Sequence, residues 1–441
     1  MRGTEVIGAN GVAIPQGTHG NAGFRTYEVH QRERVGQSTE KIKPIQLVSP
    51  EFARDPYPLL EILRENYPCY RDWLGNCYWV TRYNDVTSIF ADDANFETRP
   101  KRWMLGLENG GRDLGGEVPV LTAIANAVDG NAERLARQAV AGFAGRGRAD
   151  LAIEFAARFA LELLLAVLDL PTRDADTFSA LYLAMKRGVT WEPRLRQQGL
   201  EAAGELTEYF GPLLEQRRAD PGEDLVSAVA ALELDEGPGS AQDLVVTLLE
   251  LDFDTLHGTL ANLWLRLLEN PEKLQSVRDE PRFLKLAVLE TFRHSTPVLQ
   301  ALRFARHEVE RFGRLIPEGG LVICSAAAGN RDPRIFKNPD EFIVNRKDLC
   351  HREARGQYRA DGLATGITFG LGPPTRHPAI PEDRPRSAFA ITRDTAVTAS
   401  AVLMDALDGL ELEPGAAPFL SCRRIGEMHT CWHLPVRFRA A

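Results

Sequence analysis

Charged and hydroxyl side chains recur at helical spacing in the middle of the chain. Glu290 and Arg293 stand three residues apart in "ETFRH", so they lie on one face of the helix that the apolar pattern predicts there. Asp254 and Thr255 are adjacent, and His257 follows Asp254 by three residues. A carboxylate, a hydroxyl and an imidazole that meet in a pocket could move protons to or from a bound molecule. The alternative is a polar helix face with hydrogen bonds inside the helix and no catalytic role.

A loop with two glycines, "TFGLGPPTRHPAI" at residues 368–380, is a second candidate for chemistry. It is not a phosphate-binding loop, because no lysine and helix start follow Gly372. The sequence also contains no HExxH and no GxSxG motif, so it predicts neither a zinc peptidase nor a serine hydrolase.

Composition limits the class of protein. The 441 residues carry a formal net charge of −9 without a sustained basic cluster, which argues against a nucleic-acid binder. No uninterrupted apolar run reaches about 18 residues, so no membrane span is predicted. The six cysteines are scattered and form no CxxC pair, which is typical of reduced thiols in a cytoplasmic protein.

The elements that must position these residues are mostly helices. Helical periodicity dominates residues 130–270, and one long, largely apolar helix is predicted over about 241–270. Short strands follow residue 300, and a proline-rich irregular stretch covers about 330–390. The sequence predicts a mainly α fold with small β-sheets. It further predicts a flexible N-terminal leader over residues 1–45 and a single domain over residues 46–441.

Several of these patterns occur together and in a familiar order. The pair in "ETFR", the stretch "GNRDPRIFKNPDEFIVNR" at 329–346, "FGLG" at 369–372 and "LPVRF" at 434–438 resemble the cytochrome P450 family over nearly the whole chain from about residue 45. The resemblance implies a P450-like fold in which Glu290, Arg293 and Arg346 form a buried charge network. Two guanidinium groups on one carboxylate can hold an irregular loop in place.

The cofactor loop departs from the family pattern. The resemblance places a haem-ligating Cys at the position of Arg376, a His or Arg at Pro374 and a Gly at Pro378. An arginine stays protonated and has no lone pair for iron, so it cannot replace a thiolate. The sequence therefore predicts a fold that lacks the haem-thiolate ligand and carries no haem. His377, beside the altered position, is the alternative iron ligand, and the other interpretation is a surface histidine.

Other haem contacts of the family are also altered. Ala132 and Ala136 stand where the resemblance implies a His or Trp and an Arg for a haem propionate; a shift of one residue would place Glu133 and Arg137 there instead. Arg303 matches another propionate partner and is retained.

The helix that faces oxygen in the family is altered in the same way. The resemblance implies two small residues where this chain has Leu251 and Asp252, and these side chains would crowd the space that bound oxygen needs. The acid–hydroxyl pair of Asp254 and Thr255 is kept.

These departures lead to a functional prediction. The chain resembles the haem-free P450 homologues that activate deoxysugar glycosyltransferases, so it is predicted to be a catalytically inactive auxiliary partner, in a heteromeric complex with a glycosyltransferase of actinomycete macrolide or anthracycline biosynthesis. Two alternatives stay open. One is a haem-independent enzyme that uses Asp252, Asp254 and His257 for a non-oxidative step, and the other is an atypical haem monooxygenase with His377 on iron.

Overall fold

The computed structural model describes residues 6–7, 13–14, 41–90, 92–99, 101–107, 110–251, 253–346, 388–423 and 428–440. The chain divides into two compact units, each built from separated stretches. Unit 1 contains Met1–Arg99, Glu280–Glu382 and Phe419–Cys431, and unit 2 contains Pro100–Asp279, Asp383–Pro418 and Trp432–Ala441. The predicted leader over 1–45 lies almost wholly outside the described residues.

Unit 1 is organised around a five-stranded sheet with the order β3-β4-β12-β9-β5. The pair β4–β12 is parallel, and the other neighbours are antiparallel. All four residues of β4, "CYWV", are buried, as expected for a strand that is covered on both faces. The strands are β3 (Tyr70–Asp72), β4 (Cys77–Val80), β5 (Phe96–Glu97), β9 (Ala301–Ala305) and β12 (Leu321–Cys324).

Short helices and hairpins complete unit 1. Its apolar core joins Phe52, Leu60, Leu63 and Trp79 with the small residues of the turn at Ala327. Two further two-stranded pairs are β10–β11 and β14–β15. The elements are η1 (Pro44–Val48), α3 (Pro50–Arg54), α4 (Tyr57–Asn66), α5 (Tyr83–Phe90), α15 (Arg282–His294), α16 (Ala326–Gly329), β10 (Val309–Arg311), β11 (Arg314–Ile316), β14 (Phe419–Arg423) and β15 (Met428–His433).

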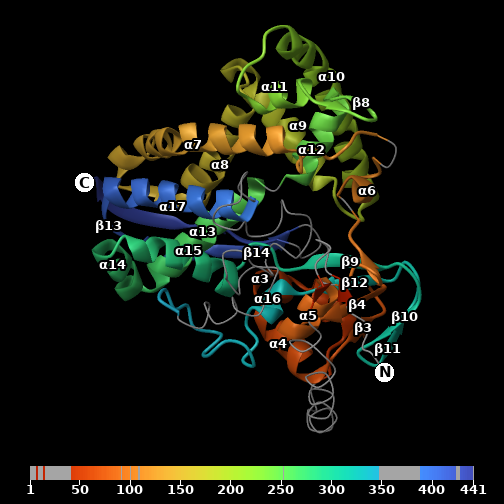
Figure 1. Cartoon of the computed structure of the whole chain (residues 1–441). Coiled ribbons are helices and arrows are strands. Elements are labelled where there is room, and N and C mark those ends of the chain that lie inside the picture. Colours follow the sequence, from red (N-terminus) through yellow and green to blue (C-terminus); the bar gives the residue numbers. More distant parts are fainter. Residues whose placement is uncertain are drawn as a thin grey trace. The chain divides into compact units, whose positions relative to one another are not determined.

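Unit 2 is mainly helical. Figure 1 shows α7 (orange) running beside α17 (blue), and α7 also contacts α8. The helices are α6 (Lys101–Leu105), α7 (Val118–Ala141), α8 (Arg158–Val167) after the π-helical turn η3 (Leu151–Ala157), α9 (Ala175–Arg187), α10 (Pro193–Ala219), α11 (Leu225–Ala230), α12 (Ala241–Glu250), α13 (Phe253–Glu269), α14 (Pro271–Asp279) and α17 (Ala388–Ala406), with single turns η2 (Ala144–Arg146) and η4 (Thr172–Asp174).

The strands of unit 2 are few and short. A three-stranded sheet has the order β13-β16-β6, and β7 pairs with β8. Their bounds are β6 (Arg148–Asp150), β7 (Glu233–Leu234), β8 (Gly237–Pro238), β13 (Leu407–Leu412) and β16 (Pro435–Ala440). Unit 1 also contains a pair of two-residue strands, β1 (Val6–Ile7) and β2 (Ala13–Ile14). The predicted mainly α fold with small β-sheets is confirmed.

The prediction of one continuous helix over 241–270 was wrong, because the structure has two helices there. α12 ends at Glu250, Leu251 is extended with φ −67° and ψ 134°, and α13 begins at Phe253. Trp264 of α13 is almost completely buried, so the expectation of a helix within the core holds for α13. Within the described ranges, no helix is long and apolar enough to cross a membrane.

Candidate functional site

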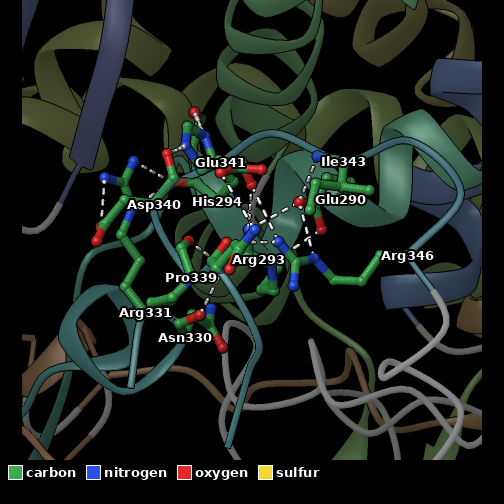
Figure 2. A network of polar contacts seen from close by, with 12 residues as sticks. Glu290, Arg293, His294, Asn330, Arg331, Pro339, Asp340, Glu341, Ile343 and Arg346 are labelled. Carbon is green, nitrogen blue, oxygen red and sulfur yellow. Dashed lines mark hydrogen bonds and ion pairs between the residues drawn. The ribbon is translucent and has the colours of Figure 1, made fainter. Parts of the chain in front are cut away.

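A fully buried charge network lies at the end of α15 in unit 1 (Figure 2). Glu290 and Arg293 face the same side of the helix because they are three residues apart. Arg293 donates from Nε to Glu290 Oε2 at 2.9 Å and from Nη2 to Oε1 at 2.7 Å, and both side chains are 0% exposed. Arg346 donates from Nε to the same Oε1 at 3.1 Å. The structure therefore brings together the three residues that the sequence analysis joined.

The two arginines also bind backbone carbonyls of the irregular segment 330–346. Arg293 donates to the carbonyls of Asn330 at 2.9 Å, Pro339 at 2.7 Å and Glu341 at 3.0 Å. Arg346 donates to the carbonyl of Glu341 as well, at 3.0 Å. A segment without regular secondary structure leaves its carbonyls unpaired, and here guanidinium groups take them. The network thus fixes the backbone that precedes residue 347.

Two residues that the sequence analysis did not use extend this network. Arg331 donates from Nε and Nη2 to the carbonyl of His294, at 3.0 and 2.6 Å, and its guanidinium lies over the ring of Tyr57 at 3.4 Å. His294 contacts the carbonyl of Asp340 through Nε2 at 2.9 Å and the hydroxyl of Ser295 through Nδ1 at 2.8 Å. A carbonyl only accepts, so Nε2 carries the proton. In the sequence, the position of His294 directly after Arg293 could have indicated that His294 belongs to the network.

Asp254, Thr255 and His257 all lie in the first turns of α13. The Asp254 carboxylate forms an ion pair with Lys186 of α9, with Oδ1 and Nζ 3.6 Å apart. His257 packs edge-on against Trp432, with ring centroids 5.3 Å apart. The carbonyl of Thr255 accepts from the hydroxyl of Thr259 at 2.7 Å. Asp252 lies outside the described residues.

A polar stripe on α12 is a feature that the sequence analysis missed. Asp243, Thr247 and Glu250 are buried and lie on one face at i, i+4 and i+7. Each accepts a backbone N–H of the segment 101–117: Asp243 Oδ1 from Arg112 at 2.6 Å, Thr247 Oγ1 from Leu114 at 2.9 Å, and Glu250 Oε1 from Arg102 at 2.9 Å. The sequence signal was the spacing of three polar residues in an otherwise apolar helix. These contacts fasten the segment 101–117 along α12.

Of the residues considered as propionate contacts, some are buried and others are exposed. Arg303 of β9 is 7% exposed, donates to the carbonyl of Leu302 at 3.0 Å and lies over the ring of Phe90 at 4.6 Å. Ala132 and Ala136 are buried in α7. Their alternatives, Glu133 and Arg137, form an exposed ion pair with each other, in which Glu133 Oε1 and Arg137 Nη2 are 2.6 Å apart.

The chemistry of the described residues fits one part of a haem site. Arg303 is a buried cation that suits a carboxylate such as a haem propionate. Burial raises the pKa of the Cys69, Cys77 and Cys324 thiols to about 12, so these side chains stay protonated at neutral pH when no metal is bound. Among the residues that the structure describes, no group of three or more His, Cys, Asp or Glu side chains could hold a metal ion.

The loop that would supply the iron ligand lies outside the described residues. This holds for the altered positions Pro374 and Arg376 and for the alternative ligand His377. At the level of side-chain chemistry, a thiolate is excluded at residue 376, whereas a neutral imidazole at residue 377 fits iron.

Comparison with known proteins places the chain in a family. Residues 253–348 match the cytochrome P450 family model. The chain is 30% identical to cytochrome P450 107B1 of Saccharopolyspora erythraea over 62% of this chain and 67% of that protein. It is 26% identical to vitamin D(3) 25-hydroxylase of Pseudonocardia autotrophica over 84% of this chain and 96% of that protein. This chain belongs to the cytochrome P450 family.

The fold agrees with solved structures. The structure of the Bacillus subtilis cytochrome P450 PksS, a protein of bacillaene polyketide synthesis, superposes with a TM-score of 0.73 at 22% identity and covers 90% of this chain and 100% of that one. The P450-like fold predicted from the sequence is therefore confirmed. The matched stretch 253–348 contains α13 and the whole of the Glu290–Arg293–Arg346 network.

Two predictions are overturned by the comparisons: the absence of haem, and the role of a catalytically inactive glycosyltransferase activator. A relative that matches over nearly its full length is named a hydroxylase, and P450 proteins activate oxygen on haem iron. The error lay in extending the chemistry of a few altered positions, above all Arg376, to the whole protein. That a complex with a glycosyltransferase forms stays a prediction.

Proposed function

We propose that this protein is a haem-dependent oxygenase of the cytochrome P450 family that acts on a small, mostly apolar molecule. The observation that carries the proposal is the similarity over 84% of the chain to a protein named vitamin D(3) 25-hydroxylase. The haem would supply oxygen activation. The substrate class follows from that relative's printed name, because vitamin D is a small apolar molecule.

Within this proposal, individual residues have separate tasks. Arg303 would hold a haem propionate, since it is a buried guanidinium with donors in a planar fork. His377 would bind iron in place of the family's cysteine. The network of Glu290, Arg293 and Arg346 acts earlier in the chain, because it fixes segment 330–346, which precedes the loop at 368–380 in the sequence.

A hemin titration tests the proposal. The purified chain is titrated with hemin, and the Soret band is followed for the wild type, for His377→Ala and for His307→Ala. His307 is an exposed histidine whose imidazole contacts Asn95 at 2.9 Å, so its variant is the matched control. We expect saturable, stoichiometric binding by the wild type and the control, and a weakened, shifted band for His377→Ala.

The two parts of the proposal fail separately. No saturable band with the wild type would contradict haem dependence. A band that is identical in the wild type and in His377→Ala would contradict the assignment of His377 and leave haem dependence standing.

A further inference from the structure

The gap between α12 and α13 has no explanation in its own sequence. Helices break at Pro, at Gly or Ser, or where another group enters the ladder of hydrogen bonds. From Ala241 to His257 the chain contains none of these three residue types. Leu251 nevertheless leaves the helical conformation. Among the described residues of this stretch, the sequence offers no such cause, and a group from another helix is the third possibility.

The entering group is the ammonium of Lys186. This side chain is 3% exposed and reaches from α9 to the end of α12. Its Nζ donates to the carbonyl of Leu249 at 3.0 Å and to the carbonyl of Leu251 at 2.8 Å. Lys101 Nζ donates to the carbonyl between them, that of Glu250, at 3.3 Å. Two lysines thus take three consecutive carbonyls that a continuous helix would pair with its own amides four residues later.

Lys186 also reaches across the gap. The Asp254 carboxylate, in the first turn of α13, stands 3.6 Å from the same Nζ. A buried ammonium is costly unless its donors are paired, and the carbonyls and the carboxylate together supply partners in three directions. One side chain therefore joins the last turn of α12 to the first turn of α13.

We propose that Lys186 is a positioning residue that holds the gap between α12 and α13 open and sets the place of the Asp254 carboxylate. Its significance for a reaction rests on the proposed function, because the resemblance assigns residues 251–255 to the oxygen side of the site. The claim about the gap itself does not depend on haem.

Hydrogen–deuterium exchange of peptides covering residues 249–258, read by mass spectrometry, tests this claim on the protein without added hemin. In Lys186→Met the carbonyls of Leu249 and Leu251 lose their donors, and the amides of Phe253 and Thr255 are the partners that a continuous helix offers them. We expect exchange in this stretch to become about tenfold slower. Lys186→Arg, which keeps a charged donor, should restore the exchange of the wild type.

Two further variants act as controls. Lys273→Met removes a lysine whose contacts are with Glu272 and Asn270 of its own segment, so exchange at 249–258 should not change. Asp254→Asn should leave the gap open, because the carbonyl contacts of Lys186 are shorter than its ion pair.

The opposite results are equally clear. Exchange at 249–258 in Lys186→Met that is equal to or faster than that of the wild type would overturn the proposal, as would slower exchange that Lys186→Arg fails to restore. If Lys186→Met does not fold, Lys186→Gln is the alternative variant. It keeps a neutral amide group as donor and should give an exchange rate between those expected for the wild type and Lys186→Met. A rate equal to that of the wild type would overturn the proposal. A failed hemin titration would leave this test unaffected.

Discussion

The buried carboxylate of Asp85 should make the stability of this protein fall as the pH rises from about 4 to about 7. Asp85 lies in the first turn of α5 and is 1% exposed. Its Oδ2 is buried and has no hydrogen-bond partner among the described residues. Burial raises the pKa of this carboxyl to about 7, and the repulsion of Asp332 adds to it, while Arg82, Arg311 and Arg334 oppose the rise.

The sign follows from proton linkage. The folded pKa of Asp85 lies above its ordinary value of 3.8, so between these two values the folded state binds more protons than the unfolded state. Stability then decreases with rising pH from about 4 to about 7 and levels off above. The difference between the two pKa values corresponds to roughly 4 kcal/mol over this window.

Urea unfolding at pH 5 and at pH 8 measures this contribution. The wild type should lose about 3 kcal/mol between the two pH values through Asp85, and Asp85→Asn should lack that loss because an amide does not titrate. Asp235→Asn, at an exposed carboxylate of the β7–β8 turn, is the control and should keep the pH dependence of the wild type. An equal difference between pH 5 and pH 8 in the wild type and in Asp85→Asn would refute the reasoning.

Two further predictions concern the polar contacts of the two units. Glu290→Gln leaves two buried guanidinium groups without their shared carboxylate, so it should lower the free energy of unfolding in urea by about 3–5 kcal/mol. The control Glu341→Gln changes an exposed side chain and should lower it little. Equal effects of the two variants would contradict the role of the network. Asp243→Asn weakens the contacts of this residue with Arg112 by about 1–3 kcal/mol. Trypsin should therefore cleave after Arg112 faster in Asp243→Asn than in the control variant Asp235→Asn. Equal cleavage rates would show that other contacts hold the segment 101–117.

How far the sequence predicted the site depends on whether the contacts are local. The spacing of Glu290 and Arg293 places them on one helix face, and the order of motifs added Arg346, so the network could be predicted. The gap after Glu250 could not, because the group that opens it, Lys186, comes from a different helix some sixty residues earlier.

The functional prediction failed for a different physical reason. It rested on a few altered positions, above all Arg376, where one side chain decides whether a thiolate can bind iron. Such a position says which ligand is excluded, and it does not say that no other group takes its place. Similarity spread over 84% of the chain outweighs these few positions.

The most direct test of the central claim is the haem content of the protein purified from cells supplied with iron and a haem precursor. We expect one haem per chain, measured as the pyridine haemochrome and retained through gel filtration. The haem content should be lower in His377→Ala. Protein that is folded, as judged by its urea transition, and yet carries no haem would contradict the account.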